Sequence, residues 1–153
     1  NQNSALYTAD SSPLDFYDAF LVLRKTLENN GTWQLFHNSY VNWAEEAVAM
    51  NAYRAKSFEA FSAIVTKMKC EGLERLDIAN FPESEAFNSL RHDCCMQIAD
   101  KDLAEVVFHY FALERRHMND LETGLSEIRC STTFKIGTKL VSPFSKIKDR
   151  LTK

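Results

Sequence analysis

The stretch 40-YVNWAEEAVAMNAYRAKSFEAFSAIVTKMKC-70 contains neither glycine nor proline, the two residues that most often interrupt regular secondary structure. Its apolar residues recur at helical spacing in two groups: Tyr40, Val41, Ala44, Ala47 and Val48, then Phe58, Phe61, Ile64, Val65 and Met68. One long helix fits this pattern, and so does a pair of helices broken near Asn51 and restarted at Ser57. We favour the interrupted form, and either form predicts an all-α fold.

The composition of the whole chain agrees with a helical fold. Only 4 Gly and 3 Pro occur in 153 residues, which is too few turn formers for a β fold of many short strands. Apolar residues make up 45% of the chain and charged residues 25%, as in globular proteins. The length fits one domain with a single core.

Further helices are expected on both sides of the opening stretch. Ser12 caps a helix that stops at Asn30-Gly31, a short turn covers 33–36, and the next helix opens at Asn38 or Ser39. Gly72 ends an element, and a fourth helix follows the corner at 80–82. After Asp100 the longest stripe recurs at steps of three and four, apart from one seven-residue gap at position 114: Ala104, Val107, Phe111, Met118, Leu121, Leu125 and Ile128.

These elements predict a flexible arm over residues 1–11 and a compact bundle of about four to five helices over 12–130. The aromatic and aliphatic positions on the stripes give the expected core, of which we name Phe20, Phe61, Phe87, Val107, Phe111 and Leu121.

Four cysteines occur, two of them adjacent. Neighbours on a helix point about 100° apart, so Cys94 and Cys95 face different partners. We predict two disulfides that join them to Cys70 and Cys130, with the connectivity open, and each would stabilise the fold by about 3–4 kcal/mol. Zinc binding that involves His92 is less favoured because the pair lacks C-x₂-C spacing. Four reduced thiols in a cytosolic protein are the other alternative.

An extracellular location is expected from two features. The even cysteine count is typical of exported domains. Asn30-Gly31-Thr32 is an N-glycosylation sequon in an expected surface turn. We therefore expect a secreted, disulfide-bonded glycoprotein.

Motifs that would carry catalysis are absent from the sequence. Glu114 and His117 form one E-x-x-H pair, but a di-metal bundle needs a second pair, so a buried ion pair of Glu114 with a basic residue is preferred. No nucleophile elbow, Walker loop, dinucleotide fingerprint or H-E-x-x-H appears. We expect no enzyme activity, cofactor, metal or nucleic-acid partner.

The end of the chain differs in charge from the rest. Residues 131–153 carry six basic side chains and one acidic, whereas residues 1–130 carry twelve basic and twenty acidic. The segment is also amphipathic, so it suits an anionic membrane surface or an acidic partner. We expect it to dock on its own bundle, with five candidate interaction residues: Lys139, Phe144, Lys146, Lys148 and Arg150.

Three functions fit these features. The first is a secreted helical protein that acts by binding a protein partner through its surface, as a cytokine-like ligand or a secreted effector. The second is an extracellular carrier of a small hydrophobic ligand or lipid in a helical cavity, which the aromatic content favours. The third is a metal-dependent bundle enzyme, supported by Glu114 and His117 alone. We favour the first.

Overall fold

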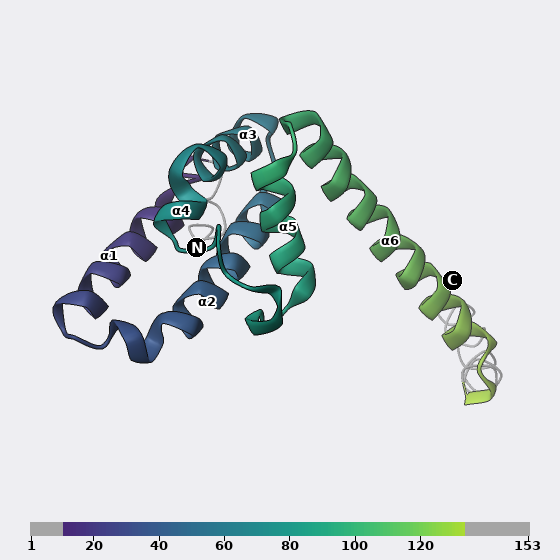
Figure 1. Cartoon of the computed structure of the whole chain (residues 1–153). Coiled ribbons are helices and arrows are strands. Elements are labelled where there is room, and N and C mark those ends of the chain that lie inside the picture. The colour runs from purple at the N-terminus through teal and green to yellow at the C-terminus, as the bar shows by residue number, and fades with distance from the viewer. Residues whose placement is uncertain (1–10, 134–153) are drawn as a thin grey trace, which may run out of the picture. The chain divides into compact units, whose positions relative to one another are not determined.

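The computed structural model describes residues 11–133, and all regular structure in that range is helical (Figure 1). The longer helices are α1 (Asp15–Asn29), α2 (Trp33–Arg54), α3 (Phe58–Lys67), α5 (Ser89–Asp100) and α6 (Leu103–Cys130). Between α3 and α5 lie a π-helical turn (Met68–Gly72), the single turn α4 (Leu73–Arg75) and a 3-10 turn (Glu83–Glu85). The predicted all-α helical bundle is confirmed.

The chain forms two compact units, residues 1–110 and residues 111–153, called here the N-terminal and C-terminal units. Helix α6 begins in the first and continues into the second.

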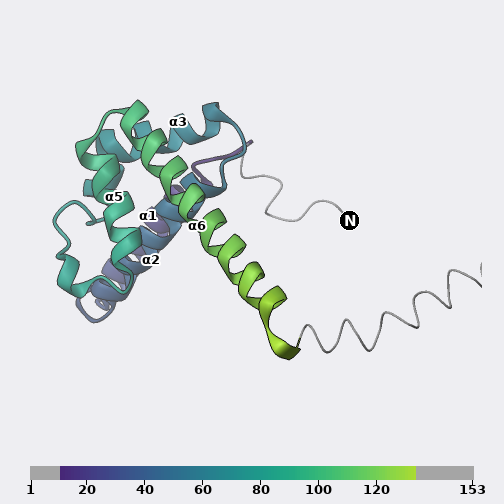
Figure 2. The same cartoon turned by 90° about the vertical axis from the view of Figure 1, so that its right-hand side faces the viewer.

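Helix α2 is the central helix of the N-terminal unit. It packs against α1, α3 and α5 (Figures 1 and 2). Alanines at positions 44, 49 and 52 are fully or almost fully buried, and such small side chains allow neighbouring helices to approach closely. Tyr40 anchors the start of α2, because its hydroxyl donates to the Phe20 carbonyl at 3.1 Å. Burial raises the pKa of Tyr40 to about 12.

The core of this unit is built from side chains of nearly every helix. Its largest fully buried apolar members are Tyr17, Tyr40, Ile64, Met68, Leu76, Ile78, Ile98, Val41, Val48 and Val106.

The helix boundaries show where local sequence signals decide the structure. Gly31 has φ of 66°, which confirms the predicted left-handed stop after α1. The hydroxyl of Ser57 accepts a hydrogen bond from Ala60 N at 3.1 Å and caps α3, so the interrupted form is confirmed. The separate turn predicted over 33–36 is wrong, because the Thr32 carbonyl accepts from Leu35 N and Phe36 N and α2 begins there without a break.

Gly72 does not end a helix, contrary to the prediction, since α4 follows it directly. A side chain at this position would lie 2.6 Å from the end of buried Met68, so the glycine leaves room for that methionine. The chain turns instead at Asp77, whose φ is 59°. An aspartate tolerates this left-handed conformation better than most residues.

Asn42 attaches the loop before α5 to α2. Its side-chain amide donates to the Glu85 carbonyl at 3.1 Å and to the Asn38 carbonyl at 2.9 Å, and its Oδ1 accepts from Phe87 N at 2.5 Å. Asn42 is buried, so these backbone groups have little access to water as a substitute.

We therefore expect Asn42→Ala to lower the free energy of unfolding by about 1–3 kcal/mol, because the loop loses its buried hydrogen-bond partners. Asn42→Asp is the matched comparison: it keeps the acceptor for Phe87 N but places an oxygen against the Glu85 carbonyl. Chemical denaturation should show that both variants are destabilised. An aspartate variant with unchanged stability would contradict the donor role of Asn42.

Four of the six named core residues are exposed, so that part of the core prediction is wrong. Phe20 and Phe61 are half-buried, and their rings contact Tyr40 and Tyr110 with centroids 5.5 Å apart in each pair. Phe87 lies in the loop before α5, and Val107 is 37% exposed beside fully buried Val106 on α6. Phe111 and Leu121 are also exposed, in a stretch from 111 to 133 that contains no buried residue.

The predicted disulfide staple is not formed. All four thiols are free: those of Cys94 and Cys95 are buried in α5, and those of Cys70 and Cys130 are exposed. The adjacent pair does face two different neighbours, as predicted, but these are His109 and the Glu45 carbonyl rather than other cysteines.

Two predicted segments fall outside the described residues. These are residues 1–10 of the N-terminal arm and residues 134–153 of the basic segment, with Lys139, Phe144, Lys146, Lys148 and Arg150. Within the described range, no helix is both long enough and apolar enough to cross a membrane.

Candidate functional site

A buried acid–base pair joins α2 to α5. Glu45 is 1% exposed, and its Oε1 accepts a hydrogen bond from His92 Nδ1 at 2.7 Å. Glu45 lies four residues after buried Val41 on the same side of α2. Burial raises the pKa of Glu45, although the hydrogen bond from His92 acts in the opposite direction. A carboxylate in this position needs its partner, because an unpaired buried charge is strongly destabilising.

The two buried thiols surround this pair. Cys95 Sγ donates to the backbone carbonyl of Glu45 at 3.7 Å, and Cys94 Sγ lies 3.8 Å from His109 Nε2. Burial raises the pKa of Cys94 and raises that of Cys95 well above its ordinary value. Thiol chemistry requires the thiolate, and burial disfavours the thiolate of both cysteines. The cluster connects α2, α5 and the start of α6.

No group of three or more metal-ligating side chains occurs within residues 11–133. Glu114 and His117, the E-x-x-H pair, are exposed on α6. The predicted burial of Glu114 is therefore wrong, because its stripe of α6 is exposed.

A second polar cluster holds the turn after α4. Asp77 accepts from Arg24 at 3.1 Å and pairs with His37 Nε2 at 3.2 Å. Arg24 also donates to the Arg75 carbonyl at 2.7 Å and lies 4.9 Å from the centre of the Trp33 ring. Asp77 therefore contacts both α1 and α2, and Arg24 of α1 also contacts α2 and α4.

An open pocket of about 530 Å³ adjoins this cluster. Its lining includes His37, Asp77, Glu74 and Glu85 beside Phe81 and Pro82. Pockets for hydrophobic ligands are mostly apolar, so a lining rich in carboxylates does not suit a lipid.

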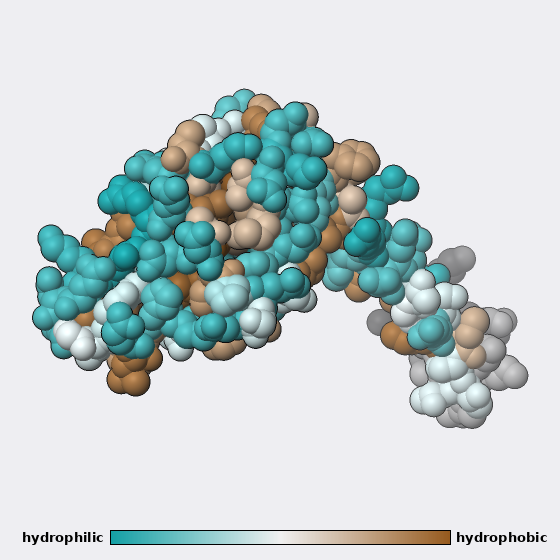
Figure 3. Space-filling model, in the orientation of Figure 1, coloured by the Kyte–Doolittle hydropathy of each residue, from teal (hydrophilic) through white to brown (hydrophobic). Residues whose placement is uncertain are grey.

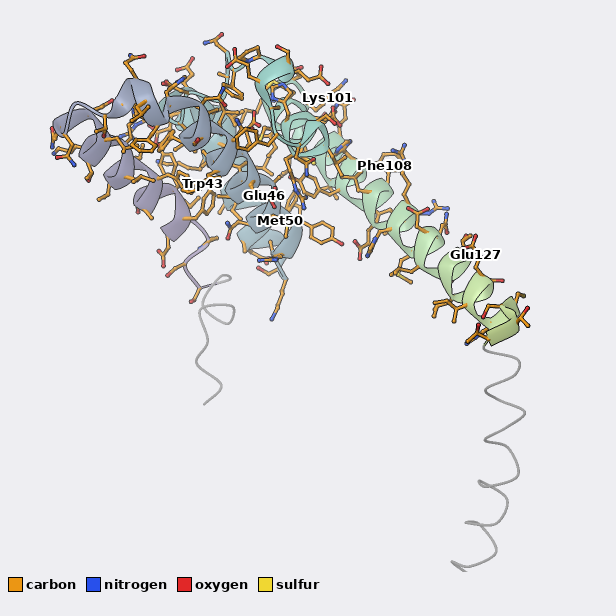
Figure 4. All side chains as sticks on the ribbon, turned by 90° about the horizontal axis from the view of Figure 1, so that it is seen from below. Trp43, Glu46, Met50, Lys101, Phe108 and Glu127 are labelled. Atoms are coloured by element: carbon orange, nitrogen blue, oxygen red, sulfur yellow. The ribbon has the colours of Figure 1, made fainter. Side chains whose placement is uncertain are left out.

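Helix α2 also carries large aromatic side chains on the side that is not buried. Its exposed side, called here the outer face of α2, consists of Phe36, Ser39, Trp43, Glu46, Met50 and Tyr53. These positions alternate steps of three and four residues and therefore form one stripe along the helix. The side chains labelled in Figure 4 show Trp43, Glu46 and Met50 in a row along α2.

The aromatic residues of this face reach solvent. Trp43 is 62% exposed, and Phe36 and Tyr53 are also exposed. Figure 3 shows hydrophobic side chains at the surface of the N-terminal unit near the junction of α1 and α2. The one charged member, Glu46, accepts from Arg91 Nε at 3.1 Å, which attaches it to α5. The outer face of α2 therefore presents three rings with a fixed charge beside them.

No protein-family model, curated protein or solved structure matches this chain.

Asn30, the sequon asparagine, is exposed in the turn between α1 and α2. The hydroxyl of Thr32, the third sequon residue, donates to the Leu27 carbonyl at 3.3 Å. The side chain that would carry a glycan is thus accessible.

The sequence prediction missed Glu45, Asn42 and the outer face of α2. Position 45 lies between Val41 and Val48 on the apolar stripe, which was the available signal for a buried carboxylate. The outer face also had a signal, because Phe36, Trp43 and Met50 are seven residues apart. The stripe of Val41, Ala44 and Val48 already predicts the core-facing side of this helix, so the sequence analysis makes no prediction for the outer face.

Proposed function

We propose that this chain is a helical protein that acts by binding a protein partner through the outer face of α2. The observation that carries the proposal is the exposure of Trp43 together with Phe36 and Tyr53 on the side of α2 away from the core. Large aromatic side chains gathered on one exposed face are often a contact surface for another molecule. The unburied side of α2 is therefore a candidate contact for another molecule.

The residue types of the outer face suit a protein partner. Trp, Tyr, Phe and Met are enriched at protein interfaces, and Trp and Tyr carry much of the binding energy there. The steps of three and four residues leave grooves into which the side chains of a partner helix fit. Glu46, held in place by Arg91, adds a polar point beside the rings.

An extracellular location and glycosylation at Asn30 remain part of the proposal, supported by the exposed sequon. The disulfide support for that location is lost, since the four thiols are free. A carrier function has less support than protein binding, because the pocket beside Asp77 is lined by charged groups.

Photo-crosslinking tests the proposal. A photoreactive phenylalanine analogue is placed at position 43 of the full chain, which is then irradiated in its native source material. We expect one abundant protein adduct that disappears when Met50→Asp is added and persists when Val22→Asp is added. Val22 is the matched control because it is an exposed apolar residue on α1 rather than on α2.

The purified partner should then bind the Trp43→Ala variant about 30-fold more weakly, as expected for an interface tryptophan that contributes about 2 kcal/mol. Melting temperatures of the Asp variants equal to that of the parent chain would show that the fold is intact. An adduct that is insensitive to Met50→Asp, or no adduct at position 43, contradicts the proposal.

A further inference from the structure

The part of α6 beyond Tyr110 carries an exposed apolar stripe. The stripe consists of Phe111, Met118, Leu121, Leu125 and Ile128, and each of these residues is at least half exposed. In α6 only Val106 and Tyr110 are buried. Isolated helices of this length are marginal in water, and Gly124 weakens this one further. The helix therefore needs a partner along this stripe.

The stripe has the repeat of a coiled coil. Phe111, Met118 and Leu125 are seven residues apart, and Leu121 and Ile128 occupy the second seam position of the same repeat. Glu114 is the one polar residue at a seam position. From Phe111 to Ile128 the seam is about 27 Å long at 1.5 Å per residue.

The charges beside the seam distinguish the two ways of pairing this helix with a copy of itself. One flank carries Arg115, Glu122 and Arg129, and the other carries His117 and Gly124. In a parallel pair the two Glu114 side chains would meet across the seam, and like charges there are unfavourable. In an antiparallel pair the same flanks face each other, so Arg115 of each copy faces Glu122 of the other.

We propose that two copies of this chain associate through an antiparallel coiled coil of α6, from Phe111 to Ile128. The register that places Met118 opposite Leu121 also places Phe111 opposite Ile128. Glu114 then lies opposite Leu125, with Arg129 of the second copy within reach as a cation. Two Arg115–Glu122 pairs and a continuous apolar seam are formed by one sequence, which is the self-complementarity that a two-fold interface requires.

Sedimentation equilibrium of the full chain tests this association, with exposed Cys70 and Cys130 changed to serine to exclude disulfide-linked species. At about 100 µM, a micromolar dissociation constant makes the dimer dominant. Leu121→Asp should make the chain monomeric without changing its melting temperature at dilute concentration. A wild-type chain that stays monomeric while Leu121→Asp lowers its melting temperature would show that a segment of the same chain covers the stripe, which would overturn the proposal.

A charge exchange tests the antiparallel direction. Arg115→Glu alone should raise the dissociation constant about tenfold, because two attractive pairs become repulsive. The double variant Arg115→Glu with Glu122→Arg should restore the original value, since the same pairs reform with exchanged signs. Failure of the double variant to restore the dimer would overturn the antiparallel arrangement.

Cysteine cross-linking in the same serine background gives an independent readout of direction. The combination Arg115→Cys with Glu122→Cys should form covalent dimers on oxidation, because these flank positions face each other between copies. Leu125→Cys alone should not, since the two copies of position 125 are about 16 Å apart in this register at 1.5 Å per residue. Rapid dimerisation of the Leu125→Cys variant would indicate a parallel pair and overturn the proposal.

Discussion

Replacing Glu45 by alanine is expected to lower the free energy of unfolding by about 3–5 kcal/mol, the largest loss we expect from a single polar residue of this chain. Glu45 is 1% exposed and holds His92 by a 2.7 Å hydrogen bond. The substitution leaves the imidazole without its partner inside the core and also leaves a cavity in the packing between α2 and α5. Chemical denaturation followed by circular dichroism measures the loss.

The matched control is the neighbouring residue. Glu46 also pairs with a group on α5, at 3.1 Å from Arg91, but the side chains of this pair are 49% (Glu46) and 24% (Arg91) exposed. Glu46→Ala should therefore cost less than about 1 kcal/mol, as for surface ion pairs. Equal losses in the two variants would contradict the structural importance assigned to the buried pair.

Glu45 should also make the stability of the protein depend on pH. Burial raises the pKa of Glu45 in the folded protein above its ordinary value of 4.5. Between these two pKa values the folded state binds more protons than the unfolded state, so the stability contribution of Glu45 falls as pH rises. It is fully present below the ordinary value. The stability difference between the wild type and Glu45→Gln should therefore decrease as pH rises through this window; an increase would contradict the raised pKa.

Replacing Ile98 by alanine is expected to cost about 2–5 kcal/mol, because the side chain is completely buried and its removal leaves a cavity. Ile98 lies in α5 near Cys94 and Cys95, so the loss should appear in the cooperative unfolding of the N-terminal unit. Thermal denaturation at a single low protein concentration measures it.

Phe111→Ala is the informative comparison, because hydrophobic periodicity alone assigned Phe111 to the core. Phe111 is 59% exposed, so its truncation should change the stability of the monomer by less than about 0.5 kcal/mol. The measurement is made where the chain is monomeric, since the proposed α6 pairing would add its own dependence on concentration. A loss as large as that of Ile98→Ala would show that Phe111 is buried in the monomer.

The sequence by itself determined the helical class of this protein and several of its helix boundaries. The absence of glycine and proline from 40 to 70, the cap at Ser57 and the left-handed stop at Gly31 are local signals. Each acts through the backbone of a few neighbouring residues, so it can be recognised without knowing which helices meet. The break between α2 and α3 was predicted for this reason.

Only the tertiary structure decided which apolar stripe is buried. Helix α2 carries two such stripes and α6 carries a long one. In α2 the buried residues lie on the inner side, and in α6 they are Val106 and Tyr110 near the start of the helix. Periodicity shows that a face is apolar but not what covers it, and burial depends on the helices that pack against it. Phe111 and Leu121 were misassigned for that reason.

Helix packing also decided which polar residues are buried. Glu114 and Glu45 both interrupt apolar stripes, but the stripe around Glu45 faces α5 and His92, whereas the stripe around Glu114 is exposed. Whether the cysteines form disulfides was decided in the same way, because the distance between two thiols far apart in sequence is set by how helices pack. Local sequence fixes which residues share a helix face, and only the packing of helices fixes which faces meet.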